Sequence, residues 1–251
     1  MKFLLSFLIA AILLTSCGSK KADLMLTTTA DYAPLIKGKY ITYELDSMIF
    51  TNFGTVEAHR FYQAKYEVID SIRDNSNRLA YQIRRSLRSI PAAGGTATTN
   101  FVPELTFSAI NTGTTFEFVE NNQRFIKLAM PIKSFYSWKG NAYINLTTPN
   151  FAGVPNSYFL DDWDYTYEDV DGPSPINFPG FNILNTVTVN QRDISSNLPV
   201  TGTTNIASKD FAKEIYAKNI GMVYRQFIHW EYQTSTKYIG YGSTMKMIDK
   251  N

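Results

Sequence analysis

The segment from Phe159 to Asp169 combines aromatic rings with carboxylates more densely than any other part of the sequence. Asp162, Trp163 and Asp164 are the candidate ligand or glycan site in it, because rings stack on sugar faces and carboxylates accept hydroxyl hydrogen bonds. Calcium binding is less favoured. In a strand, Asp162 and Asp164 would stand ~6.6 Å apart, too far to chelate one ion without a bulge. No metal site is therefore predicted.

The alternation of this segment favours a plainer interpretation, a half-buried β-strand. Trp163, Tyr165 and Tyr167 fall on one face, and Asp162 and Asp164 fall on the other. The acids of 161–171 keep a carbohydrate-active hydrolase as an alternative, since their spacing is near that of inverting glycosidases. A catalytic acid, however, needs burial to raise its pKa. The sequence has no nucleophile, zinc-protease or phosphate-loop motif, so we predict no enzyme, no catalytic residue and no cofactor.

A basic stripe follows from the best-defined hairpin, in which residues 65–73 and 78–88 pair so that opposed numbers sum to 151. Apolar side chains then share one face, and the other face is basic. This candidate surface-binding stripe would meet lipid headgroups, an acidic glycan or a protein partner, unless it is only a solvated strand face. Its residues are Arg73, Arg78, Arg84 and Arg88.

A second hairpin and a polar triplet complete the candidate features. A three-residue loop, 121–123, would oppose Phe118 with Ile126 in the hairpin of 114–130. Near the C-terminus, His229 and Glu231 share a strand face with Arg225, and we expect an exposed polar cluster there.

One serine is a candidate for modification. Asp70-Ser71-Ile72 resembles the O-glycosylation acceptor of Bacteroidota, and Ser71 falls on the polar face of its strand. Ser47 lies in a similar tripeptide but falls on an apolar face, where modification is not expected.

The N-terminus predicts a lipid anchor. Lys2 precedes an apolar stretch of 3–14, too short to span a bilayer and typical of an export signal. Leu14-Thr15-Ser16-Cys17 then resembles the bacterial lipobox, which implies cleavage after residue 16 and acylation of Cys17. Residues 17–37 would form a flexible tether. Gly18 lacks the acidic character of an inner-membrane retention signal, which points to the outer membrane.

Composition limits the remaining classes of function and fold. Lys and Arg number 24 against 22 Asp and Glu, a balance that argues against nucleic acid as a partner. A single cysteine and two histidines leave little for thiolate clusters or base chemistry. Short alternating runs across 38–251 predict one antiparallel β domain, and the pattern alone leaves a closed barrel, a curved half-barrel and a sandwich open. One short helix is expected near 208–220, capped by Ser208.

Several stretches resemble a group of Bacteroidota lipoproteins that have no assigned activity. The resemblance implies an envelope location and a curved, lipocalin-like sheet, and it transfers no catalytic residue. We therefore expect a lipid-anchored, non-catalytic binding or structural module, with a carrier of an apolar or glycan ligand as the main alternative. An envelope protein or a glycan is the expected partner besides the membrane. The matching stretches are 124–128, 137–141, 160–165, 216–224 and 240–242.

Overall fold

Alternating apolar and polar residues fold the described part of this chain into antiparallel strands with one short helix. The computed structural model describes residues 27–144 and 163–251. None of these residues belongs to a helix that is both long and apolar enough to cross a membrane. The elements are α2 (Thr29–Tyr32), β1 (Tyr40–Thr51), β2 (Val56–Arg73), β3 (Leu79–Ile90), β4 (Val102–Asn111), β5 (Thr115–Glu120), β6 (Gln123–Ala129), β7 (Ser137–Lys139), β8 (Asp164–Gly172), β9 (Thr186–Ser196), β10 (Ile206–Ala217), β11 (Gly221–Gln233) and β12 (Lys237–Lys250).

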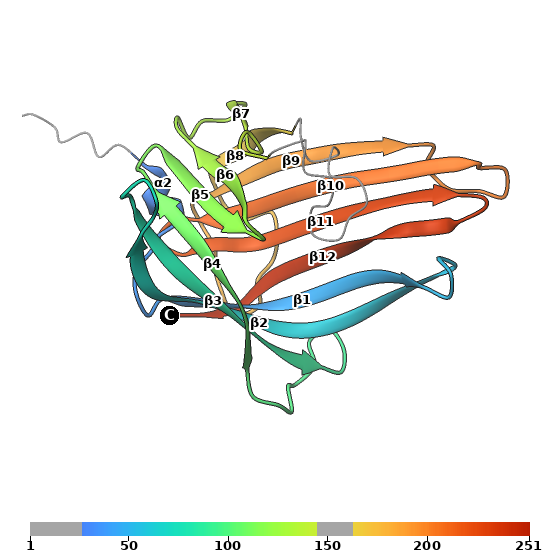
Figure 1. The fold of residues 1–251 in the computed structure, drawn as a ribbon, viewed down its shortest axis with the longest axis horizontal. Coiled ribbons are helices and arrows are strands. Elements are labelled where there is room, and N and C mark those ends of the chain that lie inside the picture. The colour runs from blue at the N-terminus through green and yellow to red at the C-terminus, as the bar shows by residue number, and fades with distance from the viewer. Residues whose placement is uncertain (1–26, 145–162) are drawn as a thin grey trace, which may run out of the picture.

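The strands form one sheet in the order β6-β5-β4-β3-β2-β1-β12-β11-β10-β9-β8-β7. The sheet curls into a nearly closed barrel, and its edge strands β6 and β7 meet (Figure 1). The Ile126 amide donates to the Gly140 carbonyl at 2.8 Å, and Trp138 Nε1 donates to the Ile126 carbonyl at 2.8 Å. These bonds satisfy backbone groups that an open edge would leave exposed. The predicted antiparallel β class is confirmed.

The N-terminal segment plugs one end of the barrel. Tyr32 is fully buried, and its hydroxyl donates to Asp171 at the end of β8. The Asn219 amide donates to the Asp31 carbonyl at 2.6 Å, and Thr29 Oγ1 donates to Asn111. The prediction of a flexible tether over 17–37 is thus wrong for its last part, because an aromatic anchor docks residues 29–33; residues 17–26 lie outside the described residues.

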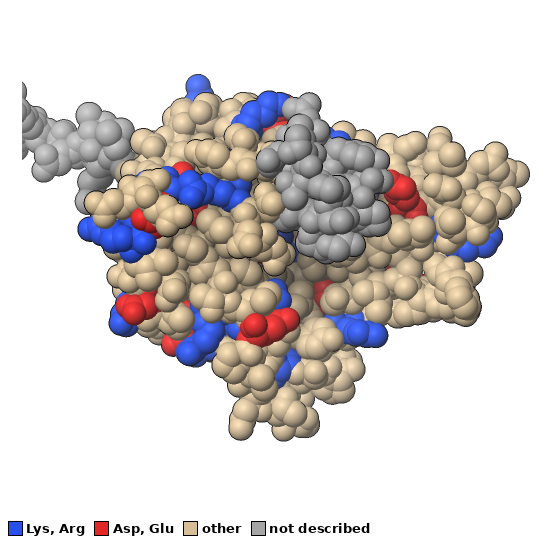
Figure 2. Space-filling view, viewed as in Figure 1, with Lys and Arg blue, Asp and Glu red and all other residues tan. Residues whose placement is uncertain are grey.

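The other end of the barrel extends into an arm. The arm comprises the far ends of β9–β12, β1 and β2, which run beyond the shorter strands β4–β8 (Figure 1). Lys, Arg, Asp and Glu are scattered over the barrel, whereas the face of the arm in view has few of them (Figure 2). Ile194, Ile206 and Ile239 on the arm are each at least half exposed.

Both predicted hairpins form, with bulges that the sequence pattern did not indicate. In β2–β3, Val68 opposes Ile83 and Glu67 opposes Arg84 as predicted, but a bulge after Val68 moves Ile72 opposite Ala80 instead of Leu79. In β5–β6, Asn121 and Asn122 both have positive φ and make a two-residue turn, so the three-residue loop was wrong. A bulge at Lys127 of β6 still brings Phe116 opposite Leu128.

The helix predicted near 208–220 is wrong, because this segment is β10. Its spacing of Phe211 and Ile215 fits a helix face, but every second residue from Ala212 to Tyr216 is also buried. Glu214, which sequence alone would place in water, points into the barrel and pairs there with Lys127. Pairing with β9 and β11 on both sides outweighs the weak local helix propensity.

Gly140 gives a stability test of barrel closure. A Cβ at this position would lie 2.4 Å from the Tyr165 ring, so Gly140→Ala should lower the free energy of unfolding by about 1–3 kcal/mol. Gly172→Ala is the matched control, since its Cβ would have no neighbour within 4 Å. Urea titration followed by circular dichroism measures both. Equal stability of the two variants would contradict close packing at the β6–β7 seam.

Candidate ligand-binding cavity

The aromatic face of 163–167 turns into the barrel, as predicted. Trp163 is 3% exposed, and Tyr165 and Tyr167 are equally buried. Asp164 faces outward and pairs with Lys139 at 3.1 Å. Asp162 lies outside the described residues. Of the candidate glycan site, the structure therefore places Trp163 inside the barrel and Asp164 on the outer surface.

The arginines of the basic stripe have partners within the chain. Arg84 pairs with Glu67 at 2.8 Å, and Arg78 pairs with Asp74 and with the buried Glu117. Two of the four charges in the stripe are therefore locally balanced, and surface binding by it stays a prediction. The two remaining members also have contacts, Arg73 with the Asn77 carbonyl and Arg88 with Gln63 and the Phe101 ring.

The polar face of β11 was assigned to the wrong side. Arg225 and Phe227 line the barrel interior, and His229 on the same face contacts Asp210 of β10. Arg225 and His229 are therefore internal where they were expected to be exposed, because carboxylates inside the barrel pair with them, whereas Glu231 is exposed as expected. Among the modification sites, Ser71 is exposed as expected, whereas Cys17 lies outside the described residues.

The barrel encloses a large cavity of about 480 Å³, in the volume range of ligand pockets. Residues from nearly every strand line it, and it lies farther from the N-terminal plug than a small apolar cavity of about 110 Å³. Ser47, the serine expected to be inaccessible, faces this space. The lining of the large cavity comprises Leu45, Ser47, Tyr62, Tyr66, Arg85, Leu87, Glu104, Glu120, Asn121, Phe125, Lys127, Asn141, Trp163, Tyr165, Gln191, Arg225, Phe227, Tyr241, Ser243 and Met245.

Three rings form an aromatic row along one wall of the large cavity. Trp163 stacks on Phe227 with ring centroids 6.4 Å apart, and Phe227 stacks on Tyr241 at 5.4 Å. Register explains the row, since Phe227 and Tyr241 lie on the same face of neighbouring strands. The guanidinium of Arg192 lies 5.7 Å from the Trp163 ring centre. The row presents flat apolar faces beside polar groups.

A β-bulge in β9 aims an amide into the large cavity. Ala212 pairs with Arg192 and Lys213 pairs with Asn190, so Gln191 is the extra residue of the bulge. Bulges re-aim side chains and are common beside binding sites. Gln191 is 5% exposed, and its Nε2 has no hydrogen-bond partner among the described residues. Arg192 Nε is likewise buried without a partner in the described part of the chain.

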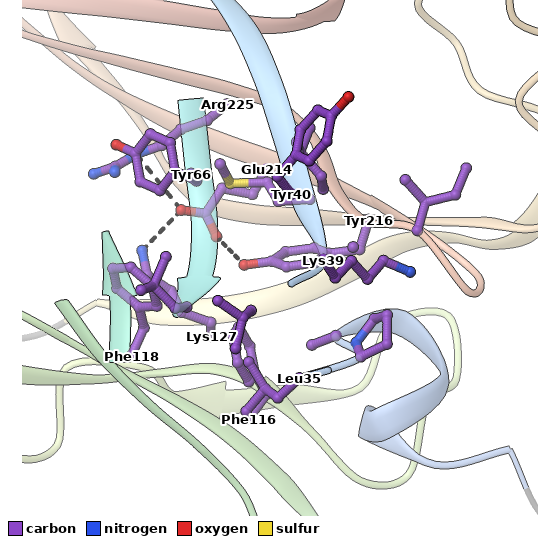
Figure 3. Close-up of a pocket in the computed structure, with 18 of the residues that line it drawn as sticks. Leu35, Lys39, Tyr40, Tyr66, Phe116, Phe118, Lys127, Glu214, Tyr216 and Arg225 are labelled. Carbon is purple, nitrogen blue, oxygen red and sulfur yellow. Dashed lines mark hydrogen bonds and ion pairs between the residues drawn. The ribbon is translucent and has the colours of Figure 1, made fainter. Parts of the chain in front are cut away.

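A charge cluster of Lys127, Glu214, Arg225 and Glu120 separates the two cavities. Lys127 Nζ lies 2.8 Å from Glu214 Oε1, and the Tyr216 hydroxyl donates to the other carboxylate oxygen at 2.7 Å (Figure 3). Arg225 lies 3.6 Å from Glu214 and 3.5 Å from Glu120. Lys127 and Arg225 line both cavities, so the cluster forms the boundary between them.

Burial and pairing act in opposite directions on the pKa values of this cluster. Burial alone would raise the pKa of Glu214, but Lys127 and Arg225 hold it below its ordinary value. Burial lowers the pKa of Lys127, and Glu214 partly offsets that effect. The pKa of Arg225 is raised, because Glu120 and Glu214 outweigh its burial. A lowered carboxyl pKa is the opposite of what a general acid needs, so Glu214 is unsuited to that one role.

Sequence reasoning missed Lys127, Glu214 and Gln191. The available signal was a lone charge within an apolar run, as in Phe125-Ile126-Lys127-Leu128, since such a charge needs a buried partner. Gln191 had no signal, because only the bulge turns it inward. No group of three or more metal-ligating side chains occurs within 27–144 and 163–251. The cavity can stack rings and donate hydrogen bonds.

Comparison with known proteins gives a limited result. No protein-family model matches the chain, and no curated protein matches it. Among solved structures, the chain is similar to a protein from Bacteroides fragilis described as exported and as having a YmcC-like fold. The two are 13% identical, with a TM-score of 0.38, and the match covers 88% of this chain and 98% of the other.

Breaking the buried pair should be costly. Lys127→Met leaves the Glu214 carboxylate undercompensated, and the free energy of unfolding should fall by about 3–5 kcal/mol in urea titrations. Adding Glu214→Gln should restore at least half of that loss. Lys37→Met is the matched control, since its pair with Asp70 is exposed and should contribute about 1 kcal/mol or less. A loss no larger than the control's would show that the pair is not buried as described.

The same pair predicts an acid dependence of stability. The folded-state pKa of Glu214 is below its ordinary value of 4.5, so its contribution is fully present above that pH. The contribution is lost as pH falls through the lowered folded-state pKa. The stability difference between the native chain and Glu214→Gln should therefore shrink between pH 7 and pH 3 in urea titrations. A difference independent of pH would contradict an ionised Glu214.

Proposed function

We propose that this chain is a non-catalytic, lipid-anchored envelope protein whose barrel holds a small ligand in the large cavity. The observation that carries the proposal is the buried Gln191 Nε2, which has no hydrogen-bond partner among the described residues and faces a cavity of about 480 Å³. A buried donor without a partner costs about 1–3 kcal/mol. A ligand that accepts a hydrogen bond from this donor, beside the aromatic row, would recover that lost stability.

The carrier is favoured over the other two functions expected from the sequence. An interaction module would present a filled core and a free basic stripe, whereas this barrel is hollow and its arginines have internal partners. A hydrolase using the acids of 161–171 gains no support from the described ones. Asp164 and Glu168 pair with lysines on the surface, and Asp171 accepts from Tyr32.

The envelope location rests on the lipobox and on the signal that precedes it. In this proposal the acyl chains on Cys17 attach the barrel to the outer membrane, since two or more chains give durable anchoring. Helix α2, Thr29–Tyr32, lies at the plugged end of the barrel. The anchor therefore joins the domain at the plugged end, and the large cavity lies on the side of the arm.

Occupancy of the large cavity can be tested with a fluorescent probe. 8-Anilinonaphthalene-1-sulfonate combines flat rings with a hydrogen-bond acceptor, so it should bind saturably and gain fluorescence. Ser243→Phe should reduce that binding at least about tenfold, because Ser243 lines the large cavity and the new ring would fill it.

The matched control is Ser195→Phe, which adds the same ring to the opposite face of the sheet, where Ser195 pairs with Lys209. Its binding curve should match that of the unmodified protein. Circular dichroism melting of both variants confirms that each folds. Unchanged probe affinity in folded Ser243→Phe would refute the large cavity as the binding site.

Anchoring is tested by replacing the single cysteine. In a bacterial host, the unmodified chain should fractionate with membranes and incorporate labelled palmitate. Cys17→Ser should lose the label and leave the membrane pellet, because its thiol is the acyl acceptor. Ser19→Ala, two residues away, should behave like the unmodified chain. Palmitate incorporation by Cys17→Ser would contradict the proposed anchor.

A further inference from the structure

We propose that the ligand of the large cavity is an acidic sugar, with its ring on the aromatic row and its carboxylate on Gln191 and Arg192. This inference rests on the proposed function and names its ligand class. Three features of the described residues carry it: the make-up of the cavity lining, the geometry of the aromatic row and the unpartnered N–H donors of the β9 bulge.

The lining of the large cavity fits a polar ligand with flat apolar faces. Seven of its 20 residues are aromatic, ten are polar or charged, and only Leu45, Leu87 and Met245 are aliphatic. A site for an acyl chain would be lined mainly by aliphatic side chains and would not answer the unpartnered Gln191 donor. A sugar satisfies both kinds of group, because its C–H face packs on rings while its hydroxyls exchange hydrogen bonds.

The aromatic row offers successive stacking surfaces. Trp163, Phe227 and Tyr241 follow one another with interplanar angles of 21° and 30°, so their faces are roughly aligned along the wall. This wall runs from the interior, where Trp163 is buried, to Tyr241, which is 38% exposed. A ligand of more than one ring could therefore enter from the arm side and occupy the row.

The charge of the ligand follows from the β9 bulge. Both unpartnered groups there, Gln191 Nε2 and Arg192 Nε, are N–H donors, and both need acceptors. Consecutive placement on one bulge brings an amide and a guanidinium to the wall that carries Trp163. A carboxylate offers two acceptor oxygens and the charge that a guanidinium pairs with best.

Other cations near the large cavity are already neutralised by carboxylates of the chain. Lys127 pairs with Glu214, Arg85 pairs with Glu104 at 2.8 Å, and Arg225 lies between Glu120 and Glu214. Arg192 is not itself part of the cavity lining, but it lies behind the Trp163 ring and has no carboxylate partner among the described residues, so it is the nearby cation that remains for a ligand's carboxylate. The wall of the β9 bulge is thus distinct from the charge cluster at the boundary of the small cavity.

Isothermal titration calorimetry with a matched pair of disaccharides tests the inference. The probes are α-1,4-linked digalacturonate and its neutral counterpart, α-1,4-linked digalactose. The acidic probe should bind at least about tenfold more tightly, as expected for a charge-assisted hydrogen bond. Gln191→Leu should lower the affinity for the acidic probe at least fivefold. Gln191→Glu keeps the shape of the side chain but should repel the carboxylate of the probe, so it should lower that affinity further.

The matched control is Gln82→Leu, because Gln82 opposes Ser108 on the face of β3 that is turned away from the large cavity. Melting by circular dichroism verifies that all variants fold. Equal affinity for the two disaccharides, or no binding of either, overturns the acidic sugar. If Ser243→Phe still blocks the fluorescent probe in that case, the proposed cavity function stands. If the acidic disaccharide is not preferred and Ser243→Phe also fails to block the fluorescent probe, the proposed cavity function is overturned as well.

Discussion

The ion pair between Lys127 and Glu214 is the interaction on which the interior of this barrel depends. Lys127 lies on the edge strand β6 and Glu214 on β10, so the pair crosses the hollow of a sheet whose edges join through few bonds. Both side chains are almost fully buried, and Arg225 and Tyr216 complete their coordination. Buried charges are tolerated only when paired, so this contact fixes which faces of β6, β10 and β11 turn inward.

The two cavities follow from that constraint. Below the charge cluster, the N-terminal segment and apolar side chains leave only a small space. Beyond it, the strands diverge toward the arm, and the space is lined by rings and polar groups. The bulge in β9 adds donors that the described chain leaves unpartnered. A structure that lacked ligand contacts would be expected to fill this region with apolar side chains, at a gain in stability.

Much of this fold is readable from the sequence, and the exceptions have two causes. Alternation correctly predicted the strands around Val68 and Trp163 and the side that Trp163 faces. It failed at Ile72 and gave no sign of Gln191, because a bulge changes which residues face inward and leaves no trace in local composition. Alternation also misassigned Arg225 and the segment near Glu214. In a sequence, a charge that is buried in an ion pair looks the same as a solvated charge until its partner is known. For Lys127 and Glu214 the two partners lie 87 residues apart, so neither one predicts the other.

The most direct test of the central claim is native mass spectrometry of the protein extracted from its own membrane in mild detergent. The account predicts mass beyond the acylated chain, lost on gentle activation and absent from the cavity-filling variant Ser243→Phe. The size of that mass would identify the ligand class. The bare acylated mass, or an adduct that Ser243→Phe retains, would contradict the claim that the barrel holds a ligand in its large cavity.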